Sequence, residues 1–419
     1  MNSITKLFHW WVGPNLPDEY VFLSPANRPK GLYSSFRIYL RQFIVHPVKR
    51  RIAKYYLVIL SIISDIKVIG ITGSAGKTTT KEMASSILER MGLTVASFAN
   101  IDPIYNIPST ILRCRTTTKY LVLEMGVEYP GEMDFYLWLA KPDIGILTNV
   151  FPTHTQFFKD VNGVLNEKSK LIKFLTKGDT AILNADERKV MNLKNETEAE
   201  VIEYGKSGSV KAVNIKRLGT KGTIFTLYIN KDKIDVHIPN IGNQFVSNAL
   251  AAASIGFACG VKLSDIAYGL KNYERAEHRM QILTLRNGAL LIDDTYNNNP
   301  EAAKATLSTF QEISTGRKKI IVFGDMLELG NQERQYHRKL GKFIGEIGAD
   351  LLICTGSLTK ETYKVAKLNI KIKQAKWFIH TDKVYNFLKA NITSNSAILV
   401  KGSRSLKLED KIVQKLSLL

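Results

Sequence analysis

A glycine-rich run that also carries a lysine and a threonine is the strongest chemical signal in the sequence. Residues 70–78 read Gly-Ile-Thr-Gly-Ser-Ala-Gly-Lys-Thr. Glycines let backbone N–H groups approach phosphates, while the lysine can reach terminal phosphates and the threonine hydroxyl can ligate Mg²⁺. A strict Walker A pattern would have a glycine where this chain has Ile71, and the alternative interpretation is a glycine turn before a surface helix. We predict an ATP-binding loop formed by Gly73, Ser74, Ala75, Gly76, Lys77, Thr78 and Thr79.

The elements around this run must place it at the end of a strand and the start of a helix. Short apolar segments alternate there with helical ones, which indicates a parallel sheet covered by helices. The expected strands are residues 68–72, 120–125, 144–149 and 181–184. Helices are expected at 77–91 and 243–259, and a hairpin at 224–238.

A second alternation begins after about residue 283, with strands expected at 289–293, 319–323, 351–355 and 397–401. This pattern is typical of a Rossmann-like domain. We therefore predict an α/β protein in three parts. These are an atypical N-terminal segment at 1–66, a central P-loop-type ATPase domain with a parallel sheet at 67–282, and a C-terminal Rossmann-like domain at 283–419.

Residues 1–66 are basic, with nine Lys and Arg against three Asp and Glu, and they include a helical stretch at 33–63. Residues 49–51 are Lys-Arg-Arg, and Lys54 directly precedes an apolar run at 55–63. Such a segment is typical of a surface helix that binds an anionic membrane or a protein partner. The alternative is that the apolar run packs against the central sheet and the charges are solvated.

Composition excludes several classes of protein. The 419 residues have 45% hydrophobic and 23% charged content, which argues against disorder and fibrous repeats. The net charge of +20 favours anionic partners, but no RNA- or DNA-binding motif accompanies it, so nucleic acid is disfavoured. Three scattered cysteines indicate buried thiols. With no signal peptide and no run of the roughly 20 apolar residues that a span needs, we expect a cytoplasmic protein, with peripheral attachment to the inner membrane face as an option.

The glycine-rich run and several segments C-terminal to it resemble the Mur ligase family. Residues 72–83 are similar to the ATP loop of these enzymes, and the similarity extends over about residues 67–410. Further matching segments are 123–126, 149–154, 243–253 and 277–280. The resemblance implies that Glu124 and His154 hold magnesium ions. It also implies that Asn248 lies on the adenine side and that Arg279 contacts the nucleotide phosphates.

Three C-terminal motifs narrow the resemblance, at residues 292–300, 322–330 and 400–405. They are similar to motifs of the family members that add D-alanyl-D-alanine to the peptide precursor of peptidoglycan. This implies an ATP- and Mg²⁺-dependent ligase that activates a carboxylate as an acyl phosphate for attack by an amine. One alternative is a family member with another acceptor and amino acid, as in folylpolyglutamate and cyanophycin synthetases. Another is a nucleotide-binding scaffold without activity, which the intact Lys77, Glu124, His154 and Arg279 argue against.

The family resemblance also assigns the remaining site residues. It implies that Lys168 is carbamylated and helps to hold the second Mg²⁺; the alternative is a solvated lysine, and the following Ser169 and Lys170 depart from the family pattern. Asp294 is expected at the ATP ribose. The other expected substrate contacts are Asn297 and Asn298 for the amine-bearing substrate and Lys401 and Arg404 for its carboxylate. The alternative for Lys401 and Arg404 is that they are surface charges without a ligand.

Two departures from the family pattern concern the segments that would recognise the acceptor. Residues 1–66 are too short for the usual domain that binds the UDP part of the precursor and lack its glycine-rich pattern. Residues 99–106 replace a characteristic Asn-rich segment, of which only Asn100 clearly remains, and Gln244-Phe245 stands where a His-Asn pair is common.

Overall fold

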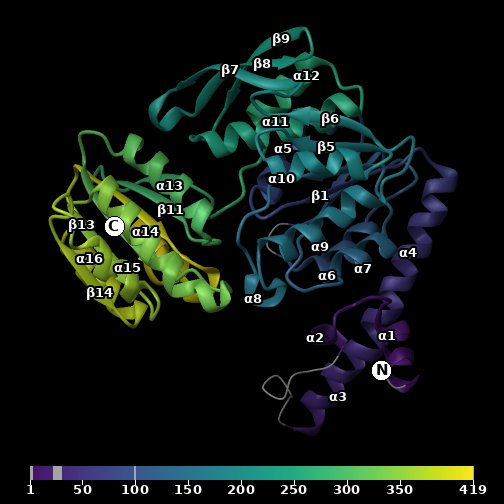
Figure 1. Cartoon of the computed structure of the whole chain (residues 1–419), viewed down its shortest axis with the longest axis horizontal. Helices are drawn as coiled ribbons and strands as arrows, with labels where there is room; N and C mark the ends of the chain where they lie inside the picture. The colour runs from purple at the N-terminus through teal and green to yellow at the C-terminus, as the bar shows by residue number, and fades with distance from the viewer. Residues whose placement is uncertain (1–2, 22–30, 99–100, 419) are drawn as a thin grey trace.

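Two sheets, each covered by helices on both faces, form most of the molecule, and a helical segment projects from the first of them (Figure 1). The structure, a computed structural model, describes residues 3–21, 31–98 and 101–418. Asn100 lies outside the described residues. The predicted α/β class is confirmed, while the predicted domain limits stay a prediction.

The first sheet has nine strands in the order β2-β3-β1-β4-β5-β6-β7-β8-β9, parallel from β2 to β7 and antiparallel from β7 to β9. Its central strands are apolar throughout because helices cover both faces. The strands are β1 (Lys67–Thr72), β2 (Thr94–Ala96), β3 (Tyr120–Glu124), β4 (Ile144–Leu147), β5 (Thr180–Asn184), β6 (Glu200–Tyr204), β7 (Val210–Arg217), β8 (Thr223–Ile229) and β9 (Asp232–Ile238). The expected hairpin is β8–β9, and β7 extends it.

Helices pack on both faces of this sheet, and each face has its own core. One face carries α5 (Lys77–Leu88), α11 (Asn243–Ala258) and α12 (Leu263–Asn272). The other carries α6 (Pro103–Ile111), α7 (Glu132–Leu139) and α9 (Val161–Phe174). In α11, the alanines at 249 and 251–253 are fully buried, so the small side chains allow close approach to the sheet.

The second sheet has six strands in the order β10-β11-β15-β12-β13-β14, parallel except for the edge strand β10. Alternate side chains of β12 face different cores: Ile321 and Phe323 lie toward α13–α15, while Ile320 and Val322 lie toward the C-terminal helices. The elements are β10 (Gln281–Thr284), β11 (Leu290–Asp294), α13 (Pro300–Ile313), β12 (Lys318–Gly324), α14 (Glu333–Ile347), β13 (Leu351–Thr355), α15 (Thr359–Ala366), β14 (Ala375–Phe378), α16 (Val384–Lys389), β15 (Ser396–Lys401), η8 (Glu409–Val413) and α17 (Gln414–Ser417).

The N-terminal segment is helical, as predicted for 33–63. It comprises α1 (Ser3–Val12), α2 (Asp18–Val21), α3 (Leu32–Leu40), a π-helical turn η2 (Arg41–Val45) and α4 (His46–Ile63). α4 packs against α6 and α7 of the first sheet, and none of the described helices has the length and apolarity that a membrane span requires.

The basic residues at 49–51 and 54 are directed toward the protein, so they do not give the predicted surface helix an exposed basic cluster, and Arg50 is not solvated as the alternative expected. Binding of a membrane or a protein partner stays a prediction. Arg50 is 2% exposed and donates to the Val12 carbonyl at 2.8 Å. Lys49 donates to Ser109 Oγ at 2.8 Å, and the Lys54 ammonium lies 4.3 Å from the ring centre of Trp138. The Arg50 bond joins α4 to α1, whereas Lys49, Lys54 and the stacking of Arg50 on Phe135 join the segment to α6 and α7. Backbone carbonyls and aromatic faces satisfy a buried cation.

Candidate active site

A large cleft lies between the two sheets, at the carboxyl ends of their strands. Its volume is about 1010 Å³, and residues of both sheets line it. β1 lies between β3 and β4, so the chain leaves β1 toward one side of the sheet and later continues on the other. A crevice forms at such a switch point in open α/β sheets, and ligands bind there.

The glycine-rich loop joins β1 to α5 in this cleft, as the sequence predicted. Gly73 and Gly76 have φ of +147° and +82°, a region that favours glycine. A Cβ on Gly73 would lie 2.0 Å from Thr148 Oγ1, and one on Gly76 would lie 2.3 Å from Asn248 Oδ1. The loop is also fixed from outside, because the Ala75 N–H donates to Asn149 Oδ1 at 2.8 Å. Contacts within the protein therefore hold the shape of this loop.

Charged and hydroxyl groups converge at the first turn of α5. Thr78 Oγ1 lies 2.9 and 3.1 Å from the two oxygens of Glu124, and Arg279 donates to the same hydroxyl at 2.9 Å. Lys77 donates to the Gly73 carbonyl at 2.9 Å, and burial lowers its pKa while Glu124 opposes the shift. Arg279 also stacks on Tyr296, 4.1 Å from the ring centre. The arrangement offers two cations, a hydroxyl and a carboxylate to a polyphosphate.

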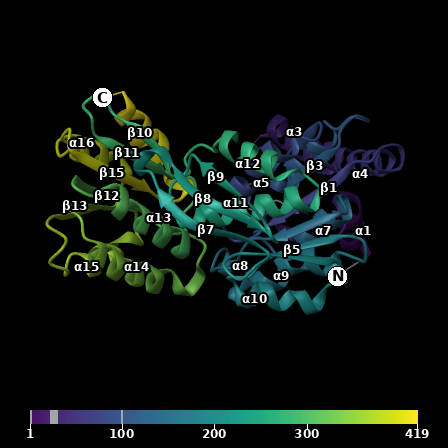
Figure 2. The ribbon, with the colours of Figure 1, turned by 90° about the horizontal axis from the view of Figure 1, so that it is seen from above.

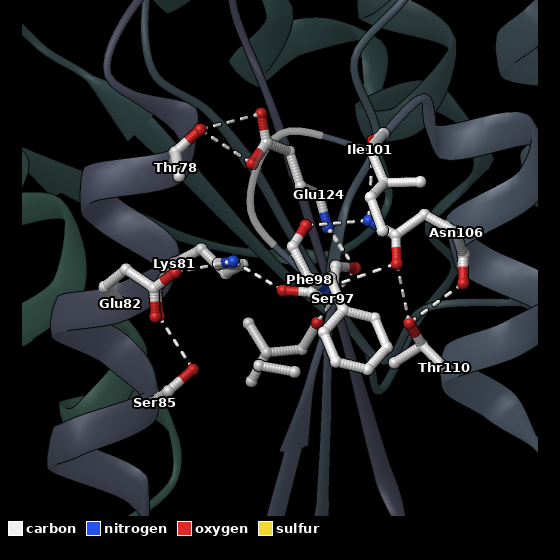
Figure 3. Close-up of polar contacts among 12 residues, drawn as sticks. Thr78, Lys81, Glu82, Ser85, Ser97, Phe98, Ile101, Asn106, Thr110 and Glu124 are labelled. Carbon is white, nitrogen blue, oxygen red and sulfur yellow. Dashed lines mark hydrogen bonds and ion pairs between the residues drawn. The ribbon is translucent and has the colours of Figure 1, made fainter. Parts of the chain in front are cut away.

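Glu124 is positioned by the segment that follows β2 (Figure 3). Its backbone N–H donates to Ser97 Oγ at 3.1 Å. The next residue, Phe98, exchanges two hydrogen bonds with the side-chain amide of Asn106 on α6, and Lys81 of α5 donates to the Ser97 carbonyl. Ser97 and Phe98 are thus held between α5 and α6, which fixes the end of β3 where Glu124 lies.

His154 lies in the cleft at the start of a short helix, α8 (Thr155–Phe158). Its Nδ1 lies 2.6 Å from Glu328 Oε2, and ligand atoms of Glu128, His154 and Glu328 all fall within 4.8 Å of one another. Burial lowers the pKa of His154, which favours the neutral imidazole that binds metals. This group and, separately, the Thr78–Glu124 pair offer oxygen ligands of the kind that suits a hard divalent cation such as Mg²⁺.

Lys168 is buried in α9, so the alternative of a solvated lysine is wrong. Its side chain is 1% exposed and has no hydrogen-bond or ion-pair partner among the described residues. Burial, reinforced by Lys77, holds its pKa well below the usual value. The neighbouring Glu167 faces elsewhere, since it accepts from the N–H groups of Gly131 and Met133 at 3.0 and 2.9 Å. Burial therefore favours the neutral amine form of Lys168 over the ammonium.

Of the substrate ligands expected from the second sheet, some are engaged in contacts within the protein and one is exposed at the cleft. Asp294 and Lys401 form an ion pair at 2.7 Å with Lys401 1% exposed, so the default of a surface charge is wrong for this lysine. Lys401 also donates to the Asn297 carbonyl at 2.9 Å. Asn298 is buried and donates to the Gly324 carbonyl at 2.9 Å, which makes it a support of the loop. Arg404 is exposed at the cleft, 5.6 Å from the ring centre of Tyr296.

One end of the cleft carries residues that sequence reasoning missed. Tyr20 of the N-terminal segment reaches it beside Asp102, Glu128 and Glu132. Burial raises the pKa values of Glu128 and Glu132 to about 7, and neighbouring carboxylates contribute. Glu128 and Glu132 lie shortly after β3, a position that could have marked them, but nothing in the sequence indicated that Tyr20 folds back into the cleft.

Comparison with known proteins covers both sheets. Residues 71–256 match the Mur ligase middle domain, and residues 278–404 match the Mur ligase glutamate ligase domain. The UDP-N-acetylmuramoyl-tripeptide–D-alanyl-D-alanine ligase of Buchnera aphidicola subsp. Acyrthosiphon pisum is 32% identical over 357 residues, which cover 84% of this chain and 76% of that protein. The chain belongs to the Mur ligase family. The predicted resemblance and the predicted class of ATP-dependent, ADP-forming ligase are thereby confirmed.

Solved structures agree with this assignment. A crystal structure of MurF from Acinetobacter baumannii matches this Mur ligase with a TM-score of 0.80 and 27% identity, covering 89% of this chain and 81% of that one. MurF from Thermotoga maritima in complex with ADP matches with a TM-score of 0.76 at 23% identity, covering 89% and 83%, a likeness of fold.

Proposed function

We propose that this Mur ligase joins D-alanyl-D-alanine, or a similar amine, to a peptide carboxylate in peptidoglycan precursor synthesis, with conversion of ATP to ADP. The observation that carries the proposal is the convergence of Lys77, Thr78, Glu124 and His154 on one cleft. The buried Lys168 lies behind them, near enough to Lys77 and His154 for their charges to interact. The name of the Buchnera relative supports the choice of substrates.

The reaction has two steps. An oxygen of the acceptor carboxylate attacks the γ-phosphorus of ATP, ADP leaves, and an acyl phosphate forms. The amine then attacks the acyl carbon, phosphate leaves with the C–O electron pair, and the amine nitrogen loses a proton. Lys77 and Arg279 offset the negative charge that spreads over the transferred group, because preorganised cations in a dry cleft act strongly on it.

Two Mg²⁺ ions are proposed at this site, where they would screen the phosphate charges when bound. Thr78 and Glu124 would hold one of them, and His154 with Lys168 the other. Lys168 would first become a carboxylate: its neutral amine attacks CO₂ and loses a proton, which gives a carbamate. Support for this step is the burial of Lys168, its lack of a partner among the described residues and its lowered pKa.

ATP is proposed to bridge the two sheets. The loop at Gly73–Thr79 would hold the phosphates, Asn248 would lie on the adenine side, and Asp294 would meet the ribose after exchange of its Lys401 contact. Asn297, Asn298, Lys401 and Arg404 would order the incoming amine substrate. Closure of the two sheets on the nucleotide would exclude water from the acyl phosphate.

A second candidate is a Mur ligase with a different acceptor. Tyr20 and the carboxylates Asp102, Glu128 and Glu132 line the end of the cleft next to the N-terminal segment. Glu128 and Glu132, with pKa values of about 7, are partly ionised at neutral pH. Their negative charge disfavours a diphosphate at this end, which favours an acceptor without UDP. For residues 1–66 we also propose an anionic membrane surface or a protein as the partner.

Release of ADP tests both candidates. The purified chain is incubated with ATP and Mg²⁺ and with a panel of muropeptide carboxylates, with and without UDP, each combined with a panel of amines. Turnover that needs UDP-N-acetylmuramoyl-tripeptide and D-alanyl-D-alanine supports the first candidate. Turnover only with acceptors that lack UDP supports the second. Substrate-independent ATP hydrolysis, or none with any pair, contradicts both.

A further inference from the structure

Apolar side chains face outward along one side of the N-terminal rod, which we define as α3, η2 and α4 together (residues 32–63). This outer stripe runs from Tyr33 and Phe36 through Ile44 and Ile52 to Ile59 and Ile62. Intervals of three, seven and eight positions place these residues on one side of a helix. Tyr33 is 80% exposed and Ile62 77%, so none of the described residues covers the ends of the stripe.

The opposite side of the rod packs against the rest of the protein and attaches the rod to it. Ala53, Leu57 and Leu60 are buried in the core that α6 and α7 share. Arg50 and Lys54 are directed to a backbone carbonyl and to the Trp138 ring. Exposed apolar area beyond that core is not needed to attach the rod, and contiguous apolar surface of this kind marks a binding surface.

Charge selects among the possible occupants. The rod contains no Asp or Glu, and of its six Lys and Arg only those at 49–51 and 54 are engaged by partners among the described residues. Arg37 and Arg41 are exposed on the rod itself. Two copies of the chain packed stripe to stripe would bring these positive charges together, and like charges repel. A bilayer with anionic phospholipid has both an apolar interior and the opposite charge.

We infer that the outer stripe binds the surface of a bilayer that contains anionic phospholipid, with the rod parallel to the membrane plane. Ile52 and Ile59 enter the boundary between head groups and acyl chains, and Arg37 and Arg41 contact head-group phosphates. α4 lies on the side of the first sheet away from the second sheet in both views (Figure 1, Figure 2), so binding leaves the cleft open. The inference deepens the proposed attachment of residues 1–66 and holds whichever substrates the ligase joins.

Co-sedimentation of the full chain with vesicles tests the inference. One set of vesicles contains phosphatidylcholine alone, and the other contains phosphatidylcholine with phosphatidylglycerol. We expect the protein to pellet with the second set, and less so as salt screens the charges. Ile52→Asp with Ile59→Asp should weaken binding at least about tenfold. Arg37→Gln with Arg41→Gln, which keeps the apolar residues and any fold they support, should weaken it about tenfold.

A matched control comes from apolar residues that are exposed elsewhere. Leu368 and Ile370, on the second-sheet side of the molecule, are 80% and 96% exposed. Leu368→Asp with Ile370→Asp should pellet like the wild type, and ADP release in solution should be unchanged in all three double variants. Equal pelleting of the wild type and both rod variants overturns the inference. So does a lipid-independent dimer that Ile52→Asp dissociates, or a monomer that binds neither vesicle, which would leave a protein as the partner.

Discussion

Two sets of basic side chains, one in the cleft and one in the N-terminal segment, lie in opposite surroundings. Lys168 has no hydrogen-bond or ion-pair partner among the described residues, and Arg279 leaves its buried Nε without a hydrogen bond. Arg50, in contrast, donates to the Val12 carbonyl and lies over the rings of Phe135 and Tyr105. At the cleft, Lys168 and the Nε of Arg279 thus keep hydrogen-bonding capacity for a ligand, although Arg279 also donates to Thr78. The contacts of Arg50 instead hold parts of the fold together.

Burial does not separate these sets, because Arg50 and Lys168 are 2% and 1% exposed. Their partners do. The run of basic residues at 49–51 suggested a binding surface from the sequence, but in the structure its side chains contact the protein itself. The isolated Lys168, in contrast, has no hydrogen-bond or ion-pair partner among the described residues. The number of basic residues in a stretch is therefore a weaker guide to binding than the acceptors that the fold supplies to each.

Removal of the loop lysine should have the largest effect. Lys77→Ala deletes a cation aimed at the phosphates, and we expect turnover to fall by about 10²–10³-fold or more, as for other preorganised donors. ADP release at saturating substrates measures it. Lys81→Ala is an unsuitable comparison because Lys81 supports the Ser97 carbonyl, so Lys119→Ala, outside the cleft, is the matched control. Undiminished turnover of Lys77→Ala would contradict the proposed role.

The second-largest effect is expected from Lys168, and it is compared with Lys170, a lysine of the same helix whose ammonium is paired with carboxylates. Lys168→Ala should lose most activity, and acetate or formate should restore part of it by supplying an oxygen ligand in place of the carbamate. Lys170 pairs with Asp134 and Glu167 at 2.5 and 2.7 Å, so Lys170→Ala should remain active and show no response to these anions. Mass spectrometry or ¹³C NMR with labelled bicarbonate should detect the carbamate on Lys168; its absence at alkaline pH with nucleotide and Mg²⁺ would count against the proposal.

The N-terminal set should affect stability and leave the chemistry intact. Arg50→Ala leaves the buried Val12 carbonyl without its donor and removes packing against two rings, which we expect to cost about 2–3 kcal/mol of local stability. Hydrogen–deuterium exchange of α1 and α4 measures this change. Arg37→Ala, at an exposed position of α3, should stay within about 0.5 kcal/mol. Equal exchange in both variants would show that Arg50 does not join the segment to the sheet.

The sequence predicted those parts of the fold and the site that local pattern determines. β1, β3 and β4 are continuous apolar runs because they are covered on both faces, and the loop residues are contiguous. β7 was missed because half of its residues are exposed and several are basic, and β2 because it has three residues. The ion pair of Asp294 with Lys401 and the approach of Tyr20 to the cleft depend on contacts between residues 107 and 82 positions apart, which no local pattern encodes.

The smallest effect concerns pH, and it arises from the crowding of cations in the N-terminal segment. His46 packs against the Tyr105 ring, with 4.9 Å between ring centres, and burial, then Arg50, Arg41 and Lys49, lower its pKa to about 4. An unfolded histidine titrates near 6.5, so between these values the opened segment binds a proton that the folded one does not. Stability is therefore complete above about pH 6.5 and falls as pH decreases toward 4.

His46→Phe keeps a ring against Tyr105 but cannot titrate, so limited proteolysis of the N-terminal segment should become less sensitive to acid in this variant. His380→Phe, at an exposed position beyond β14, should behave like the wild type. If proteolysis of the N-terminal segment begins at the same pH in His46→Phe and in the wild type, protonation of His46 does not destabilise the segment, and this prediction is wrong.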